Sequence, residues 1–329
     1  MTGEILMDST SVLIVTYNRS KLLLKTLNGV LNQTKHVSEV LIFNNHGTDD
    51  TEKLLKKEEY LDSSLDIVDG QMYKTTKDGV IISYYLNDKN LGGAGGFSKG
   101  IKLISEQNYD WLWVMDDDVV PEDNCLEEMF KQVQANNVQV GIPNRSDDNF
   151  TDTACIDFDF DDYRKFWIGL RKKSISIPKD VNSIFVKDFP FEGPLIKMDL
   201  VKKIGLPDSR YFIEYDDSDY AQRLQQYTKI VLATKATLHR QLAKKRMENT
   251  KKTEAYNWRN YYKIRNNIIF DRRYTNSWKV KLISPIILTL HHLVISCHTK
   301  NLRKNTPIIL KAYFDGMLNK MGKRVNPNY

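Results

Sequence analysis

Apolar positions in the first 140 residues follow two alternating spacings. Short apolar runs rich in β-branched residues, each followed by polar residues, are typical of buried strands. They lie at residues 11–18, 38–45, 80–87 and 110–115. Between them apolar residues recur at helical spacing, as in RSKLLLKTLNGVLNQT and GGFSKGIKLISEQ. This alternation predicts an α/β fold whose mostly parallel sheet is covered by helices on both faces, with ligands at the carboxyl ends of the strands.

The remaining residues are less regular. Residues 143–190 predict short strands and loops, and residues 191–227 predict a strand, a short helix ended by Gly205 and Pro207, and a helix that begins at acidic residues. Residues 229–241 predict two short strands, followed by a charged loop at 242–254. Three helical segments are expected at the end of the chain, near residues 255–272, 277–298 and 303–322.

Charge is distributed unevenly along the 329 residues. The net charge is +6, but from Arg240 onward there are 20 Lys and Arg against 4 Asp and Glu, so the preceding residues are net acidic. A basic tail on an acidic body suggests an anionic partner, either a membrane surface or nucleic acid. Alternatively, the basic residues of the tail could form a charged surface that contacts only solvent. Because no pattern of a nucleic-acid-binding module is present, we expect no nucleic acid.

Cysteine usage and the N-terminus indicate a compartment. Cys125, Cys155 and Cys297 lie far apart, and such an odd, scattered set is no disulfide framework. The N-terminal MTGEILMDSTSVLIV runs directly into a strand pattern and does not resemble a signal peptide. We therefore expect a cytoplasmic protein.

In the segment WLWVMDDDVVPED, residues 111–123, three consecutive aspartates directly follow an apolar strand. Because side chains alternate in an extended segment, Asp116 and Asp118 can face one side together. Two such carboxylates repel each other unless something pairs them, and Mg²⁺ or Mn²⁺ is the obvious candidate. An acidic loop or the start of the helix that follows is the alternative interpretation.

Three further features suggest chemistry. DKNLGGAGGFSKG, residues 88–100, has four glycines in five positions, which allows a close approach of the backbone to a ligand or, alternatively, a flexible turn. EYDDSDYAQR, residues 214–223, places Asp216, Asp217 and Asp219 at the start of a helix. One of these aspartates could act as a general base, or they could simply cap the helix. His239 follows a strand and could complete a metal site, although a lone His is more often structural.

In combination these motifs resemble the family 2 inverting glycosyltransferases, which have a GT-A fold. VTYNR, NLGGAGGFSKG, WVMDDDVVP, FEGPLIK, IGLPDSRYFIEYDDSDYAQR and His239 occur in that family's order over roughly residues 11–241. The subgroup with the greatest similarity contains bacterial galactofuranosyltransferases and related rhamnosyltransferases. The resemblance implies a catalytic domain over residues 1–241, with the nucleotide-sugar site in residues 11–142 and the acceptor and base region in 143–241. A basic, mostly helical region, 242–329, would follow.

The resemblance also assigns roles. Asp217 would be the catalytic base, and Asp116 and Asp118 would bind Mn²⁺ or Mg²⁺ with His239 as the third protein ligand. The acceptor would contact Phe191, Glu192, Gly193 and Asp216. The nucleotide-sugar donor would contact Thr16, Tyr17, Asn18, Arg19, Asn44, Asn45, Asn90, Gly92, Gly93, Gly95, Gly96, Asp116, Asp117 and Asp118.

The sequence departs from the family pattern at two places that concern specificity. Asn44 and Asn45 stand where many members have an acid that recognises the nucleotide base. Phe191 and Glu192 stand where galactofuranosyltransferases have a pair of Trp residues.

The expected function is therefore a metal-dependent inverting hexosyltransferase. The best candidate reaction moves galactofuranose from UDP-galactofuranose onto a hydroxyl of a growing, lipid-linked cell-surface polysaccharide. Rhamnosyl transfer from dTDP-rhamnose is the nearest alternative. A sugar nucleotidyltransferase or a non-catalytic saccharide-binding subunit would be alternatives of another class. The first lacks its expected Gly-rich loop after strand one, and the retained acids argue against the second.

The tail segment KVKLISPIILTLHHLVISCHTKNLRK, residues 279–304, has an apolar centre of about fifteen residues between basic flanks. About 20 apolar residues are needed to cross a bilayer, so we expect a helix lying in the membrane interface, at the inner face of the membrane. A helix that packs on the catalytic domain or on a second subunit is the alternative, and a homo-oligomer stays open.

Overall fold

The computed structural model describes residues 8–145, 150, 153–242 and 255–327. Within these residues a 10-stranded mixed sheet has the order β10-β12-β7-β11-β5-β1-β2-β4-β3, and β6 pairs with β12. The central pairs β1–β2, β1–β5 and β2–β4 are parallel. The strands of this sheet are β1 (Thr10–Thr16), β2 (Glu39–Asn44), β3 (Met72–Lys77), β4 (Val80–Leu86), β5 (Trp111–Asp116), β6 (Val119–Pro121), β7 (Val140–Asn144), β10 (Ser183–Val186), β11 (Leu195–Lys197) and β12 (Ile230–Arg240).

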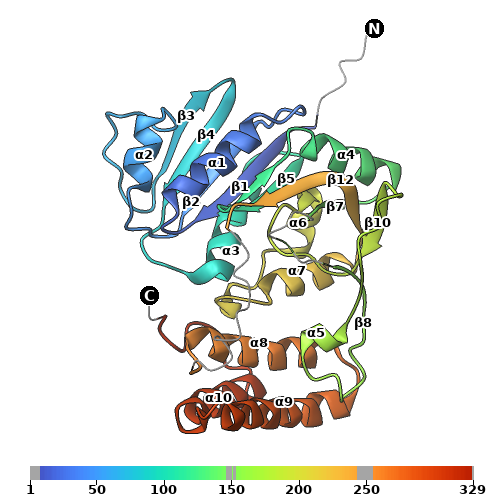
Figure 1. Ribbon diagram of the computed structural model, residues 1–329. Helices are drawn as coiled ribbons and strands as arrows, with labels where there is room; N and C mark the ends of the chain where they lie inside the picture. The colour runs from blue at the N-terminus through green and yellow to red at the C-terminus, as the bar shows by residue number, and fades with distance from the viewer. Residues whose placement is uncertain (1–7, 146–149, 151–152, 243–254, 328–329) are drawn as a thin grey trace.

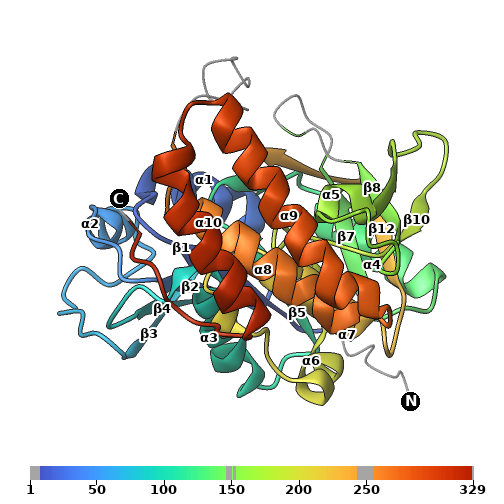
Figure 2. The ribbon, with the colours of Figure 1, turned by 90° about the horizontal axis from the view of Figure 1, so that it is seen from below.

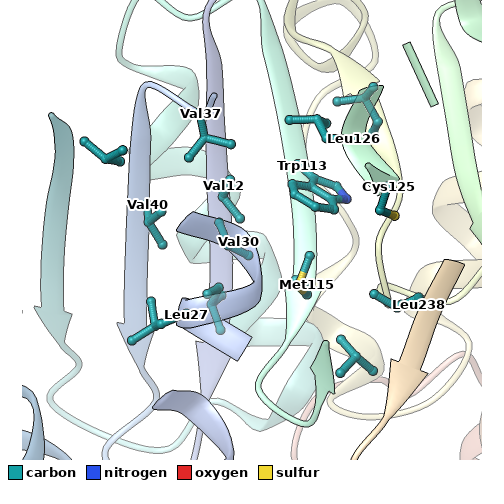
Figure 3. Packing of buried hydrophobic residues seen from close by; sticks show 14 of the residues in the cluster. Val12, Leu27, Val30, Val37, Val40, Trp113, Met115, Cys125, Leu126 and Leu238 are labelled. Atoms are coloured by element: carbon teal, nitrogen blue, oxygen red, sulfur yellow. The ribbon is translucent and has the colours of Figure 1, made fainter. Parts of the chain in front are cut away.

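Helices cover both faces of the sheet, as the alternating pattern predicts (Figure 1). Side chains alternate along β1: Val12 and Ile14 pack with one set of helices, whereas Leu13 and Val15 pack with the other. The first set is α1 (Ser20–Leu31), α2 (Thr51–Lys57) and α4 (Cys125–Ala135); the second is α3 (Gly92–Ser105), α6 (Met198–Ile204) and α7 (Asp216–Leu224). Figure 3 shows the first face, where Trp113 and Met115 of β5 lie beside Val12, near Leu27 and Val30 of α1.

The remaining short elements lie outside these layers. A two-stranded sheet is formed by β8 (Ala154–Phe158) and β9 (Lys172–Ile175), with α5 (Ile168–Arg171) before β9. A 3₁₀ turn, η1 (Ser209–Tyr211), precedes α7.

The structure corrects several predicted boundaries. The glycine-rich helix α3 begins at Gly92 and not near Gly95. Residues 230–240 form one strand with an irregularity between Ala233 and Thr237, because β12 changes partner from β7 to β6 along its length. The edge strand β3 was not predicted because its exposed residues carry no apolar run. Most of the predicted charged loop, residues 243–254, lies outside the described residues.

Three C-terminal helices, confirmed where the sequence predicts them, form a layer below the sheet (Figure 1): α8 (Trp258–Tyr274), α9 (Trp278–His298) and α10 (Leu302–Met317). A capping box starts α8, in which Asn257 Oδ1 accepts from the Arg259 amide and Asn260 Oδ1 accepts from the Asn257 amide. The helices share a core that includes Tyr261 and Tyr262 of α8 and Phe212 of the preceding region.

By length and composition, α9 is the one helix among the described residues that is long and apolar enough to cross a membrane. In the structure it packs on α8 and α10, with 33% of its apolar stretch buried. A helix in a protein core can meet the same criteria. The predicted alternative is packing on the catalytic domain or on a second subunit. The helix α9 also contacts residues before 241, because Arg171 donates to the Ser284 hydroxyl and that hydroxyl donates to the Tyr163 carbonyl.

Candidate active site

The carboxyl end of β5 is tied to the loop after β1 through Asp117. Its carboxylate accepts hydrogen bonds from the Thr16 hydroxyl at 2.7 Å and the Tyr17 amide at 3.3 Å. Arg19 bridges the next two acids, with Nη1 lying 3.0 Å from both Asp117 Oδ1 and Asp118 Oδ2. Burial raises the pKa of Asp117 to about 6, although Arg19 opposes this shift. Asp117 thus holds two strand ends together at the floor of the site.

Asp116 and Asp118 form a cluster with a third acid, Glu192, which lies just before β11. One carboxylate oxygen from each residue lies within 4.8 Å of the others. Burial and the charges of Glu192 and Asp118 raise the pKa of Asp116 well above its usual range. Three converging carboxylates with an excess of negative charge form the all-oxygen ligand set that suits Mg²⁺ or Mn²⁺.

The basic neighbours of the cluster leave part of it unpaired. Glu192 forms ion pairs with Arg145 and with Arg240, the latter at 2.5 Å. Asp118 Oδ2 meets Arg19, but its buried Oδ1 has no hydrogen-bond partner among the described residues. A buried carboxylate oxygen without a donor is costly, and a bound cation would satisfy it. The residues present therefore fit a divalent cation.

The structure does not bring His239, the predicted third ligand, to this cluster. Its Nε2 lies 3.0 Å from Oε1 of Glu122, and the ring is 44% exposed. Successive side chains on a strand point to opposite faces, so on β12 it is Arg240 that reaches Glu192. The residue that joins Asp116 and Asp118 is Glu192, which the sequence placed near the acceptor.

The cluster opens into a cleft of about 770 Å³ between the carboxyl ends of the strands and the start of α8. Most predicted site residues line this cleft. They are Thr16, Tyr17, Asn18, Arg19, Asn45, Asn90, Gly92, Gly93, Asp116, Asp117, Phe191, Glu192, Asp216 and Asp217.

Asp216 and Asp217 lie in the same cleft, at the first residues of α7. The Ser218 amide donates to Asp217 Oδ1 at 2.7 Å. Burial and the charges of Asp216 and Asp188 raise the pKa of Asp217 well above its usual range, while Lys172 opposes them. Burial likewise raises the pKa of Asp216. Such perturbed carboxyl groups in a cleft are typical of sites of proton transfer. The third acid, Asp219, pairs instead with Arg273 of α8 at 2.5 Å.

The glycine-rich helix is fixed to the cleft by Asn45. The Asn45 amide donates to the Gly92 carbonyl at 3.0 Å, and its oxygen accepts from the Leu91 amide at 3.0 Å. Gly92 has φ +74°, and a Cβ there would lie 2.2 Å from the Phe212 carbonyl oxygen. Gly92 therefore permits contact between α3 and the segment before Asp216.

Four further predicted residues lie outside both the cleft lining and the acidic cluster. Asn44 is buried, with its amide donating to the Tyr84 hydroxyl and its oxygen accepting from the Gly47 amide. Gly96 lets α3 pack closely on β1, since a Cβ there would lie 2.9 Å from Val15. A Cβ at Gly95 would lie 2.5 Å from Leu91, the residue directly before α3. Gly193 has φ +94° and its carbonyl accepts from Trp113 Nε1.

The structure adds cleft residues that the sequence did not assign. Glu214, Arg240, Trp258 and Arg259 all line it, and the last two come from the start of α8. The predicted domain boundary at residue 241 concealed Trp258 and Arg259, because no local pattern shows that a C-terminal helix returns to the cleft.

Comparisons with known proteins identify the family and the fold. The model of glycosyl transferase family 2 matches residues 11–188, more than half of the chain. Galactofuranosyltransferase GlfT1 of Mycolicibacterium smegmatis is 26% identical over 215 residues, 64% of this chain and 63% of that protein. GlfT1 of Mycobacterium tuberculosis is 24% identical over 220 residues, 66% of this chain and 64% of that protein. The chain thus spans less than two thirds of the length of these relatives.

Solved structures share the fold at low identity. Mannosyltransferase PcManGT of Pyrobaculum calidifontis, in complex with GDP-Man and Mn²⁺, has a TM-score of 0.56 at 13% identity, over 93% of this chain and 74% of that chain. S. aureus TarS residues 1–349, in complex with UDP-GlcNAc, have a TM-score of 0.52 at 13% identity, over 94% and 81%. The fold is thus GT-A. The chain belongs to glycosyl transferase family 2.

Proposed function

We propose that the protein transfers galactofuranose from UDP-galactofuranose to a hydroxyl of a saccharide acceptor, with inversion at the anomeric carbon. The observation that carries this proposal is one cleft holding both the Asp116–Asp118–Glu192 cluster and the Asp216–Asp217 pair. The named relatives support the choice of sugar, since both are galactofuranosyltransferases. Transfer from dTDP-rhamnose is the second candidate, because Asn44 is occupied elsewhere and Asn45 holds the glycine loop, so neither gives a uridine-specific contact.

Each group in the cleft has a role in the proposed reaction. Asp217 takes the proton from the acceptor hydroxyl as that oxygen bonds to the anomeric carbon and the bond to the nucleoside diphosphate breaks. Asp116, Asp118 and Glu192 would hold Mn²⁺ or Mg²⁺, which when bound offsets negative charge on the leaving diphosphate. Thr16, Tyr17 and Asn18 line the cleft and would contact the nucleoside. Phe191 and Asp216 line it too and would contact the acceptor. Arg19 and Arg259 add positive charge to the lining of the cleft.

The test is a thermal-shift and transfer panel of UDP- and dTDP-sugars with and without Mn²⁺. Stabilisation by UDP-galactofuranose only with metal, followed by transfer to an alkyl galactofuranoside, is the expected result. Asp217→Asn should keep metal-dependent donor binding and lower transfer by about 10³-fold. Asp199→Asn, an exposed acid in the first turn of α6, is the control that should retain activity. If only dTDP-rhamnose stabilises the protein, dTDP-rhamnose is the donor and the proposal of UDP-galactofuranose is wrong.

We further propose that the outer face of α9 and α10 contacts an anionic membrane surface, where a lipid-linked acceptor would reside. Exposed apolar residues recur every four positions on α9 and along the second half of α10 to Leu318, which directly follows that helix, and they form an outer stripe. The stripe consists of Trp278, Leu282, Ile286, Leu290, Val294, Leu310, Phe314 and Leu318. Figure 2, seen from below, shows these two helices in front of the rest of the molecule.

The charge near the outer stripe matches such a surface. Residues 275–327 contain nine Lys and Arg but a single acid, Asp315. Asp315 is buried, where it accepts from Tyr261 and pairs with Lys311. Apolar side chains flanked by basic ones are typical of helices that lie in a membrane interface. The protein would then act at the inner face of the cell membrane. Formation of a homo-oligomer stays a prediction.

A further inference from the structure

The segment that leads into Asp216 and Asp217 has an unusual backbone. Phe212, Glu214 and Tyr215 have φ of +70°, +63° and +74°, and none is glycine. L-residues with bulky side chains rarely adopt this left-handed conformation, and such strain persists only where surrounding contacts enforce it. Tyr215 is the residue directly before α7, so its conformation sets the direction in which Asp216 and Asp217 enter the cleft.

Side chains from α8 supply those contacts. The Asn266 amide donates to the carbonyls of Tyr211, Ile213 and Glu214 at 3.2, 2.7 and 2.9 Å. Arg265 Nη2 donates to the Tyr211 carbonyl at 2.8 Å. Both side chains are fully buried. Residues 212–215 lie in neither a helix nor a strand, so α8 takes the place of a regular hydrogen-bond partner for this backbone.

Two more contacts complete the arrangement. The Phe212 carbonyl, which Asn266 does not reach, accepts from the Ala94 amide of α3 at 3.2 Å. The Asn267 amide and the Tyr215 hydroxyl are hydrogen-bonded at 2.7 Å. All four carbonyls from Tyr211 to Glu214 are thus satisfied from outside the segment, by the glycine-rich helix on one side and by α8 on the other.

We propose that Asn266, supported by Arg265 and Asn267, is a positioning residue for the catalytic base. It holds the backbone of residues 211–215, with positive φ at Phe212, Glu214 and Tyr215, in the conformation that aims Asp217 at the acceptor. The C-terminal helical region is then part of the catalytic apparatus although none of these three side chains lines the cleft. This inference rests on the proposed role of Asp217. A misplacement of about 1 Å at a reacting group can lower a rate by about 10²-fold.

The experiment compares Asn266→Ala with Asn305→Ala in the full chain. Asn305 is equally buried, but its bonds to the Tyr256 amide and the Ser296 hydroxyl stay within the C-terminal layer. We expect both variants to lower the melting temperature. Asn266→Ala should also lower kcat by about 10²-fold with the donor KM and the metal-dependent donor affinity unchanged. Asn305→Ala should keep its kcat at temperatures where it is folded.

Tyr215→Phe is a milder second variant, which removes only the hydrogen bond with Asn267. It should lower kcat several-fold, also without a change in the donor KM. Equal loss of kcat in Asn266→Ala and Asn305→Ala, or wild-type kcat in Asn266→Ala and Tyr215→Phe, would overturn the proposal. The failure of the base assignment itself is recognised separately, because Asp217→Asn would then remain active.

Discussion

At the scale of single residues, the electrostatic surroundings of Asp217 decide when it can act. Asp216 and Asp188 raise its pKa together with burial, and Lys172, whose Nζ lies 2.5 Å from Asp188 Oδ2, lowers it. A base works only when ionised, so kcat/KM should fall as the pH drops through this raised pKa. The acid limb of the pH profile should therefore lie at higher pH than an exposed aspartate would give.

The sign of each neighbouring charge gives a paired prediction. Asp188→Asn removes a like charge and leaves Lys172 nearby, so the pKa of Asp217 falls and the acid limb moves to lower pH. Lys172→Met removes the opposing charge, so the limb moves to higher pH. The measurement is kcat/KM against pH for both variants and the wild type. Shifts in the same direction for both would show that Asp217 is not the titrating group.

The metal site gives a second residue-scale prediction. Glu192→Gln should weaken Mn²⁺ binding in the presence of UDP by more than about tenfold, because it removes a charged ligand. His239→Ala should leave Mn²⁺ affinity unchanged, since the ring faces Glu122. Titration followed by the electron paramagnetic resonance signal of free Mn²⁺ measures both. If His239→Ala weakens Mn²⁺ binding and Glu192→Gln does not, His239 is the ligand after all.

At the scale of elements, the contact between α3 and the segment before α7 joins two halves of the cleft. Gly92 makes this contact possible, because only a residue without Cβ fits beside the Phe212 carbonyl. A Cβ on the neighbouring Gly93 would meet no heavy atom of the described residues within 4 Å, and Gly93 has no positive φ. These two adjacent glycines therefore differ sharply in what they tolerate.

Gly92→Ala should lower the free energy of unfolding by at least about 2 kcal/mol, because it combines backbone strain with a clash. Gly93→Ala, the matched control, should leave stability unchanged or raise it by about 0.5 kcal/mol. Urea denaturation followed by circular dichroism measures both. A Gly92→Ala protein as stable as the Gly93→Ala protein would contradict the close contact with Phe212.

At the scale of the whole molecule, the C-terminal layer cannot be treated as a detachable tail. The buried pair of Arg171 and Asp271, 2.8 Å apart, links the end of α5 to α8, and Arg171 also donates to Ser284 of α9. Deleting residues 277–329 would expose the shared core around Tyr261 and Tyr262. Substitutions on the outer stripe are therefore the sound test of a membrane contact.

The double substitution Ile286→Asp and Leu290→Asp should lower binding to vesicles of phosphatidylcholine with phosphatidylglycerol by at least about tenfold. Val68→Asp, an equally exposed apolar position in the sheet domain, should bind as the wild type does. Binding of the wild type should weaken in high salt and in vesicles of phosphatidylcholine alone. If the double variant binds vesicles normally but no longer self-associates, the stripe is instead an interface between copies of this chain.

The sequence by itself determined the layered α/β fold and most residues of the cleft. Strand ends with polar residues after apolar runs, such as Thr16–Arg19 and Asp116–Asp118, are local signals, and the carboxyl ends of parallel strands must meet at one edge. The tertiary structure alone decided which distant side chains converge. Whether His239 or Arg240 faces Glu192 depends on the register between β12 and β6, and α8 reaches the Asp217 segment only through long-range packing. Neither register nor packing leaves a periodic pattern in the chain, so only the folded molecule contains them.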